Sequence, residues 1–395
     1  MLGTMPPQHA PELKDVEHLV EAILIRLPPD EPETFLRASL VCKPWCSLLS
    51  DHGFRSRYRA FHKTAPMLGL FHSEYRFAPF ISTTKFLPRN PRHNYSHFMA
   101  DCRHGRILFE NKHSLVAWDP MTGNTTKLSL PQRDDAATVF SSAGVLCAVR
   151  GCDHGACHLG PFFVVFLTLD NDEAVATANV YSSETSTWSS PSSLHLGFFE
   201  YELYLSTITT LLTGDALHFL FVRDYHAGIL KYDLGTSCLS EVELPLEILV
   251  TDYIHSPVLI ASEEDDGRLG IADLDEENLG LSLWWREVGP DQVAAWTQPT
   301  VINLKNHLHL GDPEARRQLV GSIEGTAIIF VITDLGTRKI DLKLLSSEKL
   351  KLTREFSGSD DDLWHLVPYF SFYNPPGIYI YVVFYRCYLR VAVNK

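Results

Sequence analysis

The sequence lacks any apolar run long enough to cross a membrane. Its most apolar stretches, 162–169, 327–332 and 378–384, have only the length of β-strands. Residues 1–11 also lack a charged segment followed by an apolar one, which is the pattern of a secretory signal. We therefore expect a soluble, intracellular protein of the cytoplasm or nucleus that has no membrane partner.

A surplus of basic residues is absent as well. The 395 residues include 34 Lys and Arg against 48 Asp and Glu, which gives a net charge of −14. Because nucleic-acid-binding proteins normally carry a basic patch or stripe, this balance disfavours a nucleic-acid partner. The eight cysteines are irregularly spaced in a long chain without a signal, so we expect reduced thiols and no disulfide framework.

Helical spacing is confined to the first 62 residues. Apolar side chains recur at helical intervals over 19–27, and Pro28-Pro29 ends that helix because proline lacks an amide donor. Two further helices are predicted, starting near Pro32 and Pro44. Three helices of this length bury little on their own, so their wide apolar face predicts a partner.

This helical segment resembles an F-box, the adaptor-binding module of substrate receptors in cullin-based ubiquitin ligases. The resemblance covers about residues 13–61 and rests on Leu27-Pro28-Pro29 and on the run Leu36-Arg37-Ala38-Ser39-Leu40-Val41-Cys42-Lys43-Pro44-Trp45. Two positions depart from the family pattern: Lys14, where the family usually has proline, and Cys46, where a longer polar side chain is common. The resemblance implies a Skp-type adaptor as partner and, through it, a cullin.

The resemblance also implies which side chains meet the adaptor. They are mostly large apolar residues of the predicted helices: Leu19, Val20, Ile23, Leu27, Pro28, Leu36, Val41, Cys42, Trp45 and Leu48. Some of them must pack the core of the module itself, and the sequence does not sort the two sets.

After residue 62 the pattern changes to short apolar runs separated by Gly, Pro, Asn, Asp and Ser. Strands are predicted at 162–169, 216–222, 228–232, 326–332 and 378–384. The aromatic content of 11% and the 23 prolines are typical of a turn-rich antiparallel β architecture.

A weak internal repeat runs through this β region. Polar turns are preceded or flanked by a large apolar residue at intervals of about 50–60 positions, which suits four-stranded blades. The positions are Trp118, Tyr181, Tyr232, Trp284 and Leu345. The corners at 119–123 and 180–185 resemble those of the propeller-like domains that follow the F-box in many plant proteins. The resemblance implies a kelch-like β-propeller of five to eight blades, although no Gly-Gly pair is present.

Cys152, His154, Cys157 and His158 form the one dense cluster of metal-ligand types in the sequence. A structural zinc site needs four ligands, usually in two separated pairs, and no second pair is evident. We therefore expect a loop that contains glycine and binds no metal.

Catalytic motifs are absent from the sequence. It contains no Gly-x-Ser-x-Gly, no phosphate-binding Gly-rich loop and no His-Glu-x-x-His. The Asp-box turns of propeller sialidases fit only at Thr187-Trp188. We expect no catalysis and no cofactor, and a dispersed triad stays open because triads are defined in space.

These observations predict an α+β multidomain protein. Residues 1–12 are expected to be disordered, 13–62 to form an all-α F-box of three helices, and 63–395 to form a large β-propeller-like domain. The resemblance implies the substrate-recognition subunit of an SCF ubiquitin ligase, whose β-propeller binds a client protein that the sequence does not identify. The alternatives are a propeller-fold hydrolase and a scaffold protein that takes no part in ubiquitination.

Overall fold

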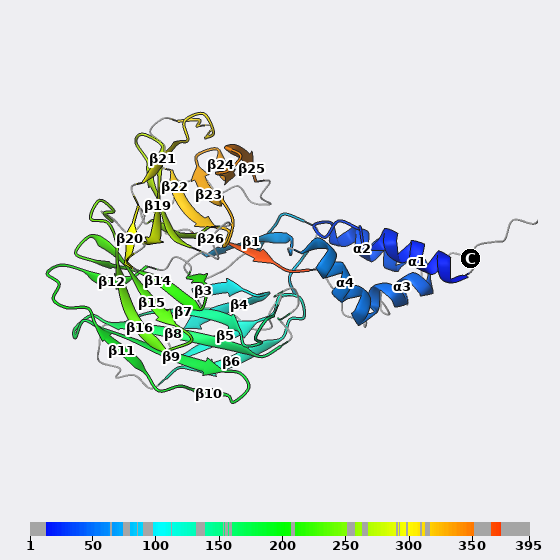
Figure 1. Cartoon of the computed structure of the whole chain (residues 1–395), viewed down its shortest axis with the longest axis horizontal. Coiled ribbons are helices and arrows are strands. Elements are labelled where there is room, and N and C mark those ends of the chain that lie inside the picture. Colours follow the sequence, from blue (N-terminus) through cyan, green and yellow to red (C-terminus); the bar gives the residue numbers. More distant parts are fainter. Residues whose placement is uncertain are drawn as a thin grey trace, which may run out of the picture. The chain divides into compact units, whose positions relative to one another are not determined.

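The computed structural model describes residues 13–63, 65–73, 80–84, 86–89, 98–111, 113–131, 139–152, 154, 157, 160–206, 210–250, 257–262, 268–289, 291, 293–297, 299–308, 310–312, 317–350 and 365–372. Within these residues, four short helices are followed by strands that form six sheets (Figure 1). Of the described helices, none is long and apolar enough to span a membrane.

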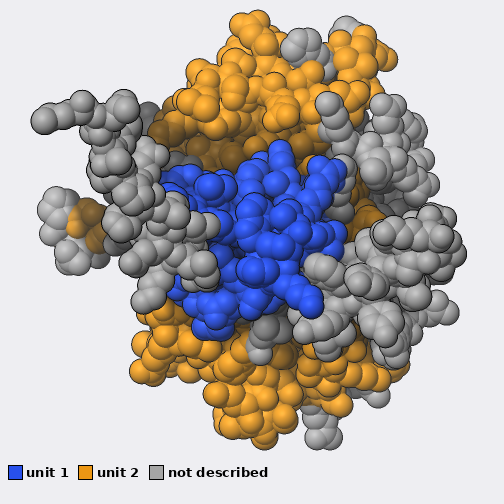
Figure 2. Space-filling view, turned by 90° about the vertical axis from the view of Figure 1, so that its right-hand side faces the viewer, with its two compact units in different colours: residues 1–68, 84–86, 370–395 blue, residues 69–83, 87–369 orange. Residues whose placement is uncertain are grey.

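The chain divides into two compact units, which Figure 2 shows in different colours. Unit 1 contains residues 1–68, 84–86 and 370–395, and unit 2 contains residues 69–83 and 87–369. The expected disordered segment, 1–12, lies outside the described residues.

Unit 1 is built on four helices. They are α1 (Leu13–Leu24), α2 (Pro32–Ser39), α3 (Lys43–Ser50) and α4 (His52–His62). The prediction of three helices was wrong, because the polar turn at Asp51 starts a separate helix. The Asp51 side chain accepts a hydrogen bond from the Phe54 amide at 2.8 Å, which satisfies one of the free donors in the first turn of α4.

The core of unit 1 is aromatic. Tyr58 packs edge-on against Phe35, with ring centroids 5.5 Å apart, and against Phe372 at 6.1 Å. Its hydroxyl donates a hydrogen bond to the Leu27 carbonyl at 2.8 Å, which ties α4 to the turn after α1. Phe372 is buried among these helices, so the helical core also uses a residue from the far end of the sequence.

Unit 2 contains the β-sheets, here called blades. Blade 1 contains β3 (Phe98–Arg103), β4 (Arg106–Asn111), β5 (Ser114–Trp118) and β6 (Thr125–Ser129). Blade 2 contains β7 (Val139–Cys147), β8 (Phe162–Asp170), β9 (Val175–Ser182), β10 (Thr187–Trp188) and β11 (Ser192–His195). Blade 3 contains β12 (Leu203–Leu205), β13 (Leu211–Thr213), β14 (Ala216–Arg223), β15 (His226–Asp233) and β16 (Cys238–Glu243).

The remaining blades follow the same plan. Blade 4 contains β17 (Val258–Ala261), β18 (Leu269–Asp275), β19 (Gly280–Val288), β20 (Ala294–Trp296) and β21 (Thr300–Asn303). Blade 5 contains β22 (Gln318–Ser322), β23 (Ile328–Thr333), β24 (Gly336–Asp341) and β25 (Ser346–Lys349). Blade 6 combines early and late strands of the chain, β1 (Met67–Ser73), β2 (Phe80–Ser82) and β26 (His365–Phe370).

Together these sheets form a six-bladed β-propeller over the described residues. Apolar side chains fill the spaces between successive blades; Leu167 and Leu217, for example, belong to one cluster shared by blades 2 and 3. The predicted β architecture is confirmed, and strands β8, β14, β15 and β23 lie where the sequence predicts them. The predicted strand at 378–384 lies outside the described residues.

A charged network joins the blades at the centre of unit 2. Arg103 of blade 1 donates to Asp101 at 2.6 Å, to Glu324 of blade 5 at 2.8 Å, and to the Thr210 carbonyl of blade 3 at 2.8 Å. Burial opposes the charge on Arg103, but the two carboxylates hold its pKa above the ordinary value. Since side chains from blades 1, 3 and 5 meet only near the axis of a ring, this network marks the propeller centre.

Candidate functional site

Helix α1 exposes apolar side chains on its outer face. Leu19 and Ile23 are each 62% exposed and lie one helical turn apart, whereas Leu24 of the same helix is buried in the aromatic core. The turn between α2 and α3 exposes Leu40 and Val41 in the same way. Over the described residues, unit 1 therefore has a buried aromatic core and, beside it, apolar side chains that stay exposed.

The structure separates the ten predicted adaptor contacts into three groups. The exposed group contains Leu19, Ile23 and Val41. The group that packs on the core of unit 1 contains Val20, Leu27, Trp45 and Leu48. The partly buried remainder contains Pro28, Leu36 and Cys42. The exposed group is fully available to a partner, whereas the second group packs on the core; the second and third groups keep only part of their surface exposed.

Basic residues of α4 hold the helices together. Arg57 forms an ion pair with Glu21 of α1 at 2.5 Å, and the Arg55 Nε donates to the Leu49 carbonyl at the end of α3 at 3.1 Å. Burial lowers the pKa of Arg55, and the nearby Arg59 adds to the effect. The Arg57–Glu21 pair thus connects α4 to α1, and the Arg55 hydrogen bond connects α4 to the end of α3.

Unit 2 offers two surface hollows large enough for client side chains. One has a volume of about 970 Å³ and is lined by Glu241, Glu243 and Glu247 together with Trp284 and Trp296. The Trp296 indole donates to the Glu243 carbonyl at 2.8 Å, which fixes the ring at the edge of this hollow. Glu241 is already paired with Arg223 at 2.9 Å, and Arg286 also lines the hollow. Glu243 and Glu247 beside two indoles suit a segment that carries both basic and apolar side chains.

The second hollow, also of about 970 Å³, lies beside blades 2 and 3. Its lining residues include His104, Arg150, Trp188, Asp215 and Tyr232. The link between β7 and β8 forms one wall, so the shape of this hollow depends on how that link is held.

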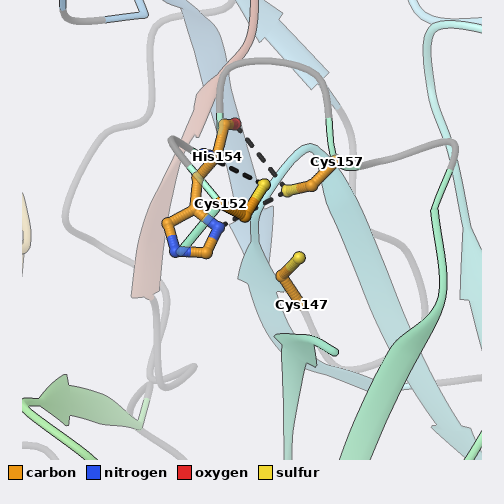
Figure 3. Close-up of side chains that lie close together, drawn as sticks. All are labelled: Cys147, Cys152, His154 and Cys157. Carbon is orange, nitrogen blue, oxygen red and sulfur yellow. Dashed lines mark hydrogen bonds between the residues drawn. The ribbon is translucent and has the colours of Figure 1, made fainter. Parts of the chain in front are cut away.

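Four metal-ligand side chains meet in that link. Cys147, Cys152, His154 and Cys157 point toward one another (Figure 3), and their ligand atoms all lie within 4.8 Å. The sequence predicts no metal here because only one group of ligand types is evident. The sequence analysis did not include Cys147 in the cluster, because this residue ends the strand β7 and lies outside the dense run of ligand types. Its separation of five positions from Cys152 is the feature of the sequence that could have indicated it.

Two neighbours shape this cluster. The His104 ring stacks on the His154 ring, with centroids 3.9 Å apart, and its Nδ1 accepts a hydrogen bond from the Cys147 amide at 3.0 Å. Because that nitrogen is an acceptor, His104 is neutral, and burial lowers its pKa to about 2. Burial raises the pKa of the Cys157 thiol, and Cys147 and Cys152 raise it further.

No protein-family model matches the chain, and no curated protein matches it in sequence. Among solved structures, the WD40 domain of SCAP from fission yeast is 15% identical, with a TM-score of 0.34; the match covers 66% of this chain and 53% of that one. A prolyl endopeptidase is 14% identical, with a TM-score of 0.33, over 65% of this chain and 34% of that one.

A protein from Lactobacillus plantarum is 12% identical, with a TM-score of 0.39, over 73% of this chain and 81% of that one. The chain thus spans about half the length of the SCAP chain and about a third of the endopeptidase chain. At these scores the similarity carries no argument about activity or partners, and the fold assignment rests on the described sheets.

Proposed function

We propose that this protein is the substrate-recognition subunit of an SCF-type cullin ubiquitin ligase. Unit 1 would dock a Skp-type adaptor, and the propeller would hold a client protein so that ubiquitin is delivered by proximity. One observation carries the proposal: Leu19, Ile23 and Val41 are exposed on a small unit whose described helices enclose a separate, buried aromatic core. Exposed apolar side chains of this size are stabilised when a partner removes them from water.

The run from Leu36 to Trp45, which carries the resemblance to an F-box, supports the same proposal. It spans the end of α2, the following turn and the start of α3. Within it Val41 lies outside while Trp45 packs on the core, so one short segment both shapes the unit and presents an apolar surface. This arrangement suits a partner that lays helices against the turn.

We infer that the chain has no catalytic role and that other subunits of the ligase supply the chemistry. The client would bind unit 2, and the hollow around Glu243 and Glu247 favours a client segment with basic residues.

Co-purification with a Skp-type adaptor tests the proposal. The full chain and the adaptor are expressed together, and the adaptor is captured by its own tag. We expect the chain to be retained, and to be lost when residues 1–62 are deleted. Because Phe372 packs among the helices, the deletion is paired with a point variant, Leu19→Gln, that leaves this core intact. Absence of co-purification, or retention after the deletion, would refute the adaptor role.

A scaffold protein gives a different result in the same assay. It would retain its clients through unit 2 and show no dependence of any interaction on the adaptor. A cullin added to the purified pair distinguishes further, since an SCF receptor is recovered with the cullin only when the adaptor is present.

A further inference from the structure

The link between β7 and β8 brings three thiols and one imidazole together in unit 2. The His154 Nδ1 lies 3.6 Å from the Cys157 Sγ, and the ligand atoms of Cys147, Cys152, His154 and Cys157 all lie within 4.8 Å of one another (Figure 3). We propose that these four side chains bind a structural zinc ion. The proposal stands apart from the ligase role, because the cluster lies in the propeller and the adaptor surface lies on the helices.

The observed spacing is close to that of a tetrahedral zinc site. With Zn–S near 2.3 Å and Zn–N near 2.0 Å, the edges of the tetrahedron are about 3.5 Å for N–S pairs and about 3.8 Å for S–S pairs. The His154 Nδ1 and the Cys157 Sγ are 3.6 Å apart, which is within about 0.1 Å of the expected N–S edge. The widest separations, up to 4.8 Å, need to contract by only about 1 Å around an ion.

A buried arginine beside the thiols supports the charge of such a site. Arg106 is 4% exposed; among the described residues its Nη1 has no hydrogen-bond partner, while its Nη2 donates to the Gly160 carbonyl. The guanidinium interacts electrostatically with Cys157 and Cys147, and also with Asp119 and Cys152. Zn²⁺ with three thiolates and a neutral imidazole carries a net charge of −1, which the arginine balances.

Backbone donors are directed at two of the sulfurs. The Val149 amide donates to the Cys147 Sγ, and the His154 amide donates to the Cys152 Sγ, each at 3.4 Å. Hydrogen bonds from N–H groups favour a thiolate over a thiol, and they orient the lone pairs of metal ligands. His154 also has a φ of 54°, a left-handed conformation that is uncommon outside glycine and that a ring–metal bond would offset.

Four protein ligands close the coordination sphere, so the site is structural and leaves no open position for a substrate. Soft thiolates and a tetrahedral arrangement favour zinc over magnesium or calcium, which prefer oxygen ligands. The ion would attach the β7–β8 link to the end of β7. Since Cys147, Arg150 and His154 line the hollow beside blades 2 and 3, zinc would fix one wall of that hollow.

Metal content tests the proposal directly. The full chain is produced in medium that contains zinc, dialysed without chelator, and analysed by plasma mass spectrometry. We expect one zinc ion per chain, lost in Cys152→Ser and reduced in His154→Ala. Cys238→Ser is the matched control, because Cys238 is exposed on β16 outside the cluster, and this variant should keep the zinc. Zinc-free wild-type protein, or equal zinc in Cys152→Ser, would overturn the proposal.

Cobalt(II) substitution gives a second measurement that does not depend on one cysteine variant. Tetrahedral cobalt with three thiolates should show strong visible d–d bands and a near-ultraviolet sulfur-to-metal charge-transfer band. His154 is exposed, so His154→Cys should fold, retain the metal and raise the charge-transfer intensity in proportion to a fourth thiolate. Octahedral cobalt spectra, or a charge-transfer band unchanged in His154→Cys, would contradict the assignment.

A disulfide within the cluster is the competing chemistry, and thiol counting separates it from zinc. The described cysteines, including the three of the cluster, are free thiols. Protein denatured without reductant should therefore show all eight cysteines of the sequence as reactive thiols, with the cluster thiols protected before denaturation. A count two lower would show a disulfide and refute the zinc site.

Discussion

Replacing Leu19 and Ile23 by glutamine should abolish most adaptor binding without unfolding the protein. Both side chains are 62% exposed on one face of α1, and glutamine is as good a helix former as leucine. The fold should therefore keep its stability within about 0.5 kcal/mol, as is usual for exposed positions.

The expected loss of affinity follows from the area that a partner would cover. Burial of a whole Leu or Ile side chain is worth about 1.5–3 kcal/mol, and the exposed 62% of each residue is still available for burial by a partner. Each residue then contributes about 1–2 kcal/mol, and the pair contributes about 2–4 kcal/mol. This corresponds to a dissociation constant about 30- to 700-fold higher.

Titration calorimetry with purified Skp-type adaptor measures this change, and thermal unfolding of the same samples checks the fold. Leu246→Gln is the matched control, since Leu246 is 77% exposed in unit 2 and should not contact the adaptor. A double variant that is folded and binds the adaptor within twofold of wild type would refute the reasoning. Loss of binding in the control would show that general surface hydrophobicity, not α1, drives the interaction.

Three further predictions concern unit 2. Arg103→Leu should lower the free energy of unfolding in urea by about 3–5 kcal/mol, because it leaves the buried Asp101 without its cationic partner. Adding Asp101→Asn should restore part of that loss, and the absence of any restoration would contradict the pairing. Burial lowers the pKa of His218 to about 4 in the folded protein, against about 6.5 in the unfolded state. The unfolded state therefore binds more protons below pH 7, and the free energy of unfolding should fall by about 2 kcal/mol between pH 7 and 5. His218→Gln should remove this decrease, and an unchanged pH profile in the variant would contradict the prediction. Chelation of zinc should speed trypsin cleavage after the exposed Arg150, and Arg150→Gln is the control that should not give this cleavage fragment. An equal cleavage rate with and without chelator would contradict a role of the metal in holding the β7–β8 link.

The sequence predicts the two kinds of secondary structure and their order, but not the number of helices. Apolar spacing predicts α1, and prolines mark the first turns of α2 and α3. The break between α3 and α4 depends on one side chain, that of Asp51, whose capping hydrogen bond competes with continuation of the helix. A single capping residue is a weak signal in a sequence that contains many Asp and Ser.

The blades repeat a turn that the apolar spacing only partly reveals. An aspartate at or just after the end of a strand accepts the amide two or three residues further on. This happens at Asp119, Asp170, Asp233, Asp275 and Asp341. The predicted repeat matches it directly at the first and third of these positions, where Trp118 and Tyr232 precede the aspartate. At Asp170 and Asp275 the predicted apolar residue lies in the next strand instead, Tyr181 in β9 and Trp284 in β19, and Leu345 follows Asp341 just before β25.

The division of the adaptor residues was beyond sequence reasoning for a similar physical cause. Helical spacing places Val20 and Ile23 on neighbouring positions of α1, yet one packs on the core and the other is exposed. Val20 packs against a cluster that includes Phe372, which the sequence separates from α1 by most of the chain. Local periodicity contains no information about such a distant contact.

The metal cluster and the adaptor face can be perturbed independently, which makes the two proposals separable. Zinc removal should loosen the link that lines the hollow beside blades 2 and 3, but Leu19 and Ile23 belong to the other compact unit. Chelated protein should therefore bind the adaptor normally, and any client held in that hollow should bind more weakly because its wall must first be ordered. A client that binds equally well without zinc would instead point to the acidic hollow around Glu243, whose lining residues include none of the four ligands. The same chelation experiment thus tests which of the two hollows takes the client, whatever the outcome for the adaptor.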